Sequence, residues 1–232
     1  MVTLPDYDEM FTGEFVTDIA VMRNKFRNIK AFVFDWDGVF NNGHKDVQGQ
    51  STFSEIDSMG INLLRFNTYL FRKQMPITAV FTGENNEVAY AFAKRENFNN
   101  VYFKVMHKEL ALKHFCQQHN LTINEVMYVY DDVLDFSVAK LVALRMMVGR
   151  KSNPLTIEFA KHQRLVDYIT QHDGGHNAIR EVTELCLLLS NSFHKVMELR
   201  MKFAEDYQQY IALRKTVNPT FFTLQNNQIV TP

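Results

Sequence analysis

The chain has 232 residues, of which 46% are hydrophobic and 22% are charged, and its formal net charge is -1. These values are typical of a globular protein long enough to bury a full core. They show neither the basic excess that attracts nucleic acid nor the acidic excess of a disordered chain. No apolar run approaches the ~18 residues of a membrane span, and the first residues lack a signal-peptide pattern, so we expect a cytoplasmic protein without a membrane partner.

The chain divides into three predicted parts. Residues 1–28 form an N-terminal extension, residues 29–189 form the main domain, and residues 190–232 form a helix and an extended tail. In the main domain, short apolar runs that indicate strands alternate with amphipathic segments that indicate helices. This alternation predicts an α/β fold with a doubly wound parallel sheet, in which the chemistry lies at the carboxyl ends of the strands.

The predicted elements follow in chain order, beginning with one helix in the extension, from about Phe15 to Phe26. Strands are expected at Ala31 to Phe34, Ile77 to Phe81, Val101 to Phe103 and Val126 to Tyr130, with weaker candidates at Arg145 to Val148 and Asp167 to Ile169. Helices are expected at Ile61 to Arg72, Asn86 to Asn97, Lys108 to His119, Asp135 to Leu144 and Thr156 to His162. Asn42-Gly43 is a strong two-residue turn signal, so we expect a β-hairpin projecting just after the first strand. An apolar stripe beyond Gly175 predicts helices that reach about Thr216.

Polar side chains gather where three of these strands end. Asp35 and Asp37 follow the first strand, and in an extended chain residues i and i+2 point the same way. Thr82 follows the second strand, and Asp131 follows the fourth. Two carboxylates brought together repel unless a cation or a shared proton compensates them. With a third carboxylate from Asp131, a hard divalent ion such as Mg²⁺ is the expected cofactor. Aspartates at strand ends are also common turn formers and helix caps, and this alternative stays open for Asp35 taken alone.

Four motifs in this order resemble the haloacid dehalogenase superfamily of phosphohydrolases. They are "DWDGVF", "VFTG", the lysine of "MHKELAL" and "YDDVLD". The segments "IDSMGINLL" and "GGHNAIRE" are similar to its capless branch, which contains the phosphatases for 3-deoxy-D-manno-octulosonate 8-phosphate and N-acylneuraminate 9-phosphate. The resemblance covers roughly residues 29–189.

The resemblance implies two-step phosphoryl transfer from a small phosphomonoester. Asp35 would be the nucleophile and Asp37 the general acid and base, while Thr82 and Lys108 would bind and neutralise the transferring group. The magnesium ligands would be Asp35, the backbone carbonyl of Asp37 and Asp131, with Asp132 or Asp135 ordering the water shell. Substrate-binding positions are expected at Gly38, Asn41, Ile56, Gly83 and Glu84.

The spacing of the motifs leaves no room for a lid domain. Only 44 residues separate Asp37 from Thr82, and 25 separate Thr82 from Lys108. Water must therefore be excluded in another way. The resemblance implies a homotetramer in which each subunit covers its neighbour's site.

Several departures from the branch pattern lie around the expected substrate. Glu84 replaces an arginine, Tyr130 replaces a glycine, and Ile56, Ser58 and Asn62 stand in the region where basic residues are usual. Each lost charge-assisted hydrogen bond is worth about 1.5 to 3 kcal/mol, so we expect a substrate other than the standard sugar-acid phosphates. The same departures motivate an alternative function, a catalytically weak or inactive module for assembly or ligand binding. The retained aspartates, threonine and lysine favour the phosphatase.

Overall fold

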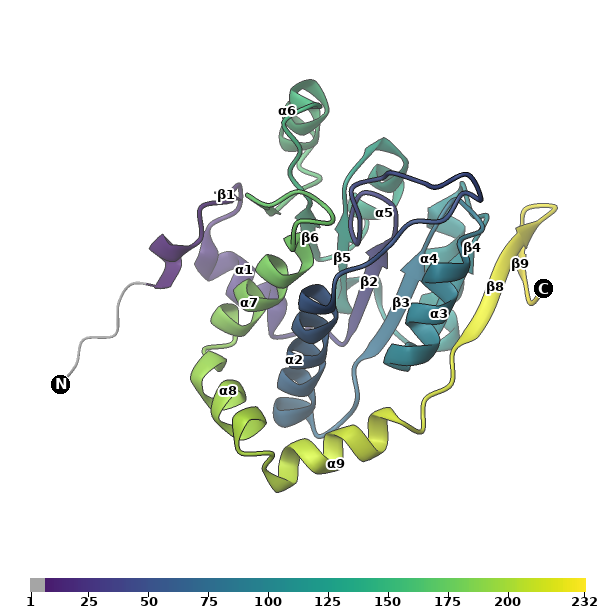
Figure 1. Cartoon of the computed structure of the whole chain (residues 1–232). Helices are drawn as coiled ribbons and strands as arrows, with labels where there is room; N and C mark the ends of the chain where they lie inside the picture. Colours follow the sequence, from purple (N-terminus) through teal and green to yellow (C-terminus); the bar gives the residue numbers. More distant parts are fainter. Residues whose placement is uncertain (1–6) are drawn as a thin grey trace.

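Strand β2 (Ala31–Asp35) lies at the centre of the fold, and all five of its residues are buried. The computed structural model describes residues 7–232, and in that part of the chain nine strands form one sheet in the order β1-β7-β6-β5-β2-β3-β4-β8-β9. The inner pairs are parallel, whereas the outermost strands β1 and β9 run antiparallel to their neighbours. Because the chain builds outward from β2 in both directions, the predicted doubly wound sheet is confirmed (Figure 1).

The bounds of the elements are as follows. The other strands are β1 (Glu14–Phe15), β3 (Ile77–Phe81), β4 (Asn100–Phe103), β5 (Val126–Tyr130), β6 (Leu144–Met147), β7 (Tyr168–Ile169), β8 (Thr220–Gln225) and β9 (Gln228–Val230). The α-helices are α1 (Ile19–Phe26), α2 (Glu55–Arg72), α3 (Glu87–Glu96), α4 (Lys108–Gln118), α5 (Phe136–Ala139), α6 (Pro154–His162), α7 (Ala178–Leu189), α8 (Phe193–Met201) and α9 (Glu205–Arg214). Short 3₁₀ helices cover Tyr7–Met10, Ile123–Glu125 and Val133–Asp135.

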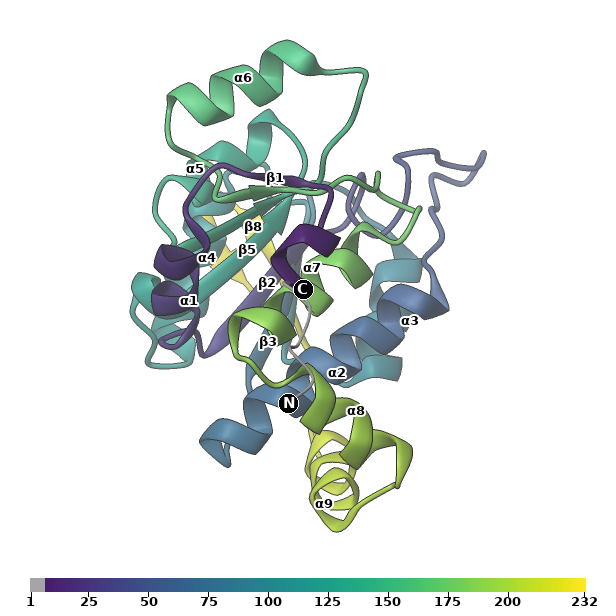
Figure 2. The ribbon, with the colours of Figure 1, turned by 90° about the vertical axis from the view of Figure 1, so that its left-hand side faces the viewer.

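Helices cover both faces of the sheet. Helices α1, α2, α3 and α7 share one apolar core with the sheet, and α4, α5 and α6 share the core on the opposite face. A third cluster joins α2 and α7 to α8 and α9 outside these two layers, and both ribbon views show α8 and α9 beside α2 (Figures 1 and 2). No helix of the described residues is long and apolar enough to cross a membrane.

The strands between residues 31 and 148 lie where the apolar runs predict them, within one residue at each end. Helix α2 starts six residues earlier than predicted, because the Ser54 hydroxyl caps it by accepting a hydrogen bond from Ile56 N at 3.1 Å. The first six residues of the predicted extension 1–28 lie outside the described residues. Within the remainder, β1 pairs with β7 and so adds a strand to the sheet.

The predicted β-hairpin after β2 is wrong. Residues 41–54 leave the sheet as a loop that contains no strand. Gly43 does adopt a left-handed φ of +80°, as the Asn42-Gly43 turn requires. However, the loop is organised by side chains, such as Asn41 Oδ1 accepting from Gly43 N at 2.8 Å, and by a tight turn from Asp46 to Gln50. The residues on either side of the turn do not alternate between apolar and polar, so they form no strands, and the turn signal gives a loop and not a hairpin.

The chain beyond α9 is extended, as predicted, but it is not a free tail. Strand β8 pairs in parallel with β4, and β9 folds back on β8. Phe222 anchors this edge: its ring stacks on Tyr102 at 5.1 Å between centroids and meets His114 edge-on at 4.7 Å. The segment that follows the helical part of the chain thus completes the sheet.

Replacing Phe222 by Ala should lower the free energy of unfolding by about 3 kcal/mol, since a nearly buried aromatic ring is lost and a cavity remains. Urea unfolding of the variant measures this loss. Phe71→Ala is the matched control, because the Phe71 side chain is 59% exposed and its loss should cost under ~1 kcal/mol. Equal stability of the two variants would contradict the anchoring role of Phe222.

Candidate active site

Three buried carboxylates meet at the carboxyl edge of the sheet. Asp35 is the last residue of β2, Asp131 follows β5, and Asp135 precedes α5. Carboxylate oxygens of all three lie within 4.8 Å of one another, an arrangement that could hold a metal ion. Since β2 and β5 are adjacent parallel strands, their ends must bring Asp35 and Asp131 together.

Two cations partly balance these carboxylates. Lys108, the first residue of α4, donates from Nζ to Asp35 Oδ1 and to Asp135 Oδ1, both at 2.6 Å. Arg150 donates from Nη2 to Asp131 Oδ2 at 2.8 Å. The Tyr128 hydroxyl also donates to Asp135. Three carboxylates therefore face two cations, which leaves one negative charge in a buried place.

The pKa values of the cluster reflect this imbalance. Burial and the neighbouring Asp135 raise the pKa of Asp35 well above its usual range, against the opposing effect of Lys108. Burial and Asp135 likewise raise the pKa of Asp131 to about 7. Burial alone would lower the pKa of Lys108, but Asp35 and Asp135 raise it above its ordinary value. The lysine is thus held as a cation, and the carboxylates are short of positive charge, as expected of an all-oxygen site for a hard divalent ion.

The turn after β2 is closed by glycine. Gly38 has a φ of +82°, and a Cβ there would lie 2.0 Å from Asp131 Oδ2 and 2.6 Å from Arg150 Nη2. Gly174, from the "GGHNAIRE" segment, packs on the other side, where a Cβ would lie 2.0 Å from Gly38 O. This close packing sets the turn that carries Asp37 directly against the Asp131–Arg150 pair.

Asp37 lies beside the loop 41–54 and is only partly buried. Its Oδ1 accepts from the Ser51 hydroxyl at 3.0 Å, and its Oδ2 pairs with Lys45 Nζ at 3.1 Å. Ser51 Oγ also accepts from Trp36 Nε1 at 2.9 Å and from Asn86 Nδ2 at 2.7 Å. The loop therefore orients Asp37 while leaving it reachable by a substrate.

Thr82 lies next to the cluster along the sheet edge. It follows Phe81, which pairs with Asp35 in the register of β2 and β3. Its buried hydroxyl accepts from Glu84 N at 3.2 Å. Gly83 is close to Met106, whose Sδ would lie 3.2 Å from a Cβ at this glycine. Glu84 itself is exposed.

Three predicted site residues lie apart from the carboxylates. Asp132 is exposed, and its side chain caps the next turn by accepting from Val133 N at 2.7 Å, so Asp135 and not Asp132 joins the cluster. Asn41 is buried and bonds within its own loop. Ile56 is 52% exposed at the start of α2.

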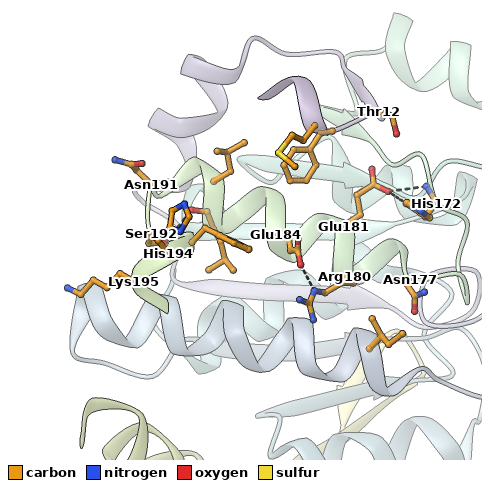
Figure 3. Close-up of a pocket in the computed structure, with 16 residues that line it drawn as sticks. Thr12, His172, Asn177, Arg180, Glu181, Glu184, Asn191, Ser192, His194 and Lys195 are labelled. Carbon is orange, nitrogen blue, oxygen red and sulfur yellow. Dashed lines mark hydrogen bonds and ion pairs between the residues drawn. The ribbon is translucent and has the colours of Figure 1, made fainter. Parts of the chain in front are cut away.

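Ile56 lines a different cavity of about 690 Å³, which none of the clustered aspartates lines. This cavity is lined by residues of α7 and by the segment from Met10 to Thr12, and Figure 3 shows its lining residues. Its polar groups are largely paired: Arg180 contacts Glu184, and Glu181 holds His172 (Figure 3). Ile56 thus lies apart from the clustered aspartates, and its predicted role in substrate binding stays a prediction.

Arg150 and Tyr128 were not among the predicted residues. Arg150 comes shortly after β6, so a search for cations at every strand end could have found it. Tyr128 carried no signal, because an aromatic residue inside an apolar strand is indistinguishable from core.

By its fold and its buried aspartates, the chain is similar to the phosphatases of the haloacid dehalogenase superfamily. Among them, it is similar to the 3-deoxy-D-manno-octulosonate 8-phosphate phosphatases named KdsC. The KdsC protein of Escherichia coli K12 is 27% identical over 168 residues, which are 71% of this chain and 82% of the relative. No protein-family model matches the chain.

Solved structures show the same architecture. A hydrolase of the superfamily's subfamily III A from Legionella pneumophila superposes with a TM-score of 0.64 at 26% identity, covering 78% of this chain and 94% of the other. The 3-deoxy-D-manno-octulosonate 8-phosphate phosphatase of Moraxella catarrhalis, solved with a magnesium ion, a phosphate ion and a KDO molecule, superposes with a TM-score of 0.64 at 23% identity. The superposition covers 76% of this chain and 96% of the Moraxella chain. The likeness to the Moraxella structure concerns the fold.

Proposed function

We propose that this protein is a magnesium-dependent phosphomonoesterase that hydrolyses a sugar phosphate through an aspartyl-phosphate intermediate on Asp35. The observation that supports this most is the buried group of Asp35, Asp131 and Asp135 around Lys108 at the carboxyl edge of the sheet. Such a group has a clear use in phosphoryl transfer, where positioning and charge neutralisation supply most of the catalysis.

Asp35, Asp131 and Asp135 would hold the ion, together with the backbone carbonyl of Asp37. The bound ion would neutralise charge on the phosphoryl oxygens. Asp131 and Asp135 come from one short segment after β5, so their relative position is set by local chain geometry. Oxygen ligands and a net negative charge fit Mg²⁺ better than a softer metal.

The first step forms a bond between Asp35 Oδ and phosphorus and breaks the bond from phosphorus to the sugar oxygen. Asp37 gives its proton to the departing oxygen, so the sugar leaves as an alcohol. Lys108, held at 2.6 Å from Asp35, opposes the effect of burial by favouring the ionised nucleophile and then neutralises the transferred group. Thr82, at the next strand end, donates its hydroxyl hydrogen to a phosphoryl oxygen.

The second step reverses the proton flow. Asp37 takes a proton from water, the water oxygen attacks phosphorus, and the bond to Asp35 breaks to release inorganic phosphate. The contacts of Asp37 with Ser51 and Lys45 hold its carboxyl group beside the reaction in both steps. Closure of the site by neighbouring subunits of a homotetramer, and a cytoplasmic location, stay predictions.

A neutral sugar phosphate is the substrate we favour over a sugar-acid phosphate. Lys45, Lys108 and Arg150 are each already paired with a site carboxylate, and the exposed Glu84 near Thr82 would repel a second acidic group on the substrate. The exposed side chains that flank the cluster, Val133 and Leu134, are apolar.

A substrate panel tests both parts of this proposal. With Mg²⁺, the wild-type protein should hydrolyse p-nitrophenyl phosphate and neutral sugar phosphates, and chelation with EDTA should abolish the activity. Free phosphate released from each compound is the readout. Absence of turnover with several divalent ions would favour the binding-module alternative. Turnover of the octulosonate phosphate far above neutral sugar phosphates would overturn the substrate assignment alone.

A further inference from the structure

A second cavity, of about 270 Å³ and lined by many charged side chains, lies between α2, α3, α8 and α9. It is lined by three arginines, one from α3 (Arg95), one from α8 (Arg200) and one from α9 (Arg214). None of the clustered aspartates of the phosphoryl site lines it. Helices α8 and α9 lie beyond the stretch 29–189 that carries the superfamily motifs, so this cavity depends on a part of the chain that the phosphatase site does not use.

The three arginines differ in how well they are paired. Arg95 is well satisfied, because it contacts Glu55, donates from Nε to Glu96 at 2.9 Å and reaches Ser58 at 2.9 Å. Arg214 has a long contact of 3.4 Å with Glu96 and also interacts with the Tyr210 side chain. The structure shows no ion pair for Arg200 within residues 7–232, and its guanidinium lies over the ring of Tyr207 at 4.5 Å.

A fourth arginine lies near Glu96 and Arg214 but does not itself line the cavity. Arg65 is 1% exposed and donates to the backbone carbonyls of Glu96 and Asn97, which carry no full charge. The Nε atoms of Arg65, Arg200 and Arg214 are buried without a hydrogen-bond acceptor. The cavity lining thus holds three guanidiniums and two carboxylates, those of Glu55 and Glu96. The buried Arg65 nearby adds a fourth guanidinium, so positive charge exceeds negative charge by two among these side chains.

We propose that this cavity binds a small phosphate-bearing molecule. The excess of two positive charges matches a phosphate dianion, and the planar guanidinium fork suits oxyanions in particular. Stacking on Tyr207 fixes the plane of Arg200 before a ligand arrives, which lowers the entropy cost of binding. At ~30 Å³ for each water displaced, the cavity has room for a phosphate with a short organic group.

The position of the cavity allows a bound molecule to influence the phosphoryl site through helix α2. Its α2 side consists of residues from Glu55 to Asn62, directly after the loop 41–54 that orients Asp37. Ser54, the cap of α2, bonds to Asn177 at 3.0 Å, at the start of α7. A ligand that joins α2 to α8 and α9 would thus stabilise the helix on which that loop ends.

Binding of inorganic phosphate and of pyrophosphate to the full-length, EDTA-treated protein tests the proposal by isothermal titration calorimetry. Arg200→Gln should weaken the tighter-binding probe at least tenfold, since one charge-assisted interaction is lost. Arg200 makes no ion pair in the described chain, so its loss should not unfold the protein. Arg214→Gln should weaken binding similarly and serves as a second variant.

Lys202→Gln is the matched control, because Lys202 is an exposed cation of the same region whose ion partner is Glu198. It should bind the probe as the wild type does. Hydrogen exchange locates the site, with ligand protection expected at residues 55–62 and 193–214. Unchanged affinity in both arginine variants, an equal loss in Lys202→Gln, or protection confined to residues 31–38 and 104–110 would each overturn the proposal. None of these readouts depends on phosphatase activity.

Discussion

Replacing Asp35 by Asn should reduce phosphatase activity at least about 1,000-fold, on the scale of losses seen when a covalent nucleophile is removed. The amide cannot form the acyl phosphate, and it no longer offers Lys108 a charged partner. Phosphate release under saturating substrate and Mg²⁺ measures the effect. The overall shape of Asn is close to that of Asp, so the close packing of Gly38 and Arg150 around the turn should persist.

Asp132→Asn provides the control in the same set of strand-end carboxylates. Asp132 is exposed and caps Val133 N, and Asn is an equally good capping residue, so activity should stay within about threefold of the wild type. Asp135→Asn should instead lose most activity, because it removes a carboxylate from the cluster. A large loss in Asp132→Asn with little change in Asp135→Asn would show that the cluster is not the working site.

Lys108→Met should both inactivate and destabilise the protein. The Lys108 side chain is 3% exposed and is the shared partner of Asp35 and Asp135, so its loss leaves buried carboxylates uncompensated. Breaking a buried pair in this way costs about 3 to 5 kcal/mol, which corresponds to a fall in Tm of roughly 10 °C for a protein of this size. Thermal unfolding in EDTA at neutral pH measures the loss.

The same variant should respond to cations and protons in a defined way. Mg²⁺ should restore part of the lost stability, since it supplies the missing positive charge. Acidic buffer should also reduce the difference in Tm between Lys108→Met and the wild type, because protonated carboxyl groups need no counter-ion. Lys113→Met, on the same helix but exposed and paired only with Glu109, should change Tm by about 1 °C or less. Equal effects of the two lysine variants would rule out the electrostatic argument.

Local patterns predicted the inner sheet well but not its edge. The runs Ile77–Phe81 and Val126–Tyr130 are short, apolar and bounded by polar residues, so their strand assignment depended on no distant partner. Strand β8 is different, because "TFFTLQ" becomes a strand only through pairing with β4, more than a hundred residues earlier. The hairpin prediction failed for the opposite reason, since a strong local turn signal had no strands to join.

The site shows the same division between local and distant information. Asp35 and Asp131 were predictable because each directly follows a strand, and adjacent parallel strands end together. The choice between Asp132 and Asp135 could not be made from spacing, because it depends on how the turn after β5 winds before α5. Spacing also could not place Ile56, because α2 begins at Glu55 and so puts this residue in the lining of the cavity along α7.

The hydrogen bonds around Ser51 have a practical consequence. Trp36 is the only tryptophan of the chain, and its indole donates to the same hydroxyl that donates to Asp37. The fluorescence of this one indole therefore reports on the loop that carries Ser51 and Lys45, without any attached dye. A change that moves Asp37 away from Ser51 alters the environment of the indole, which is two hydrogen bonds from Asp37. Tryptophan fluorescence can therefore follow changes at the carboxyl edge of the sheet.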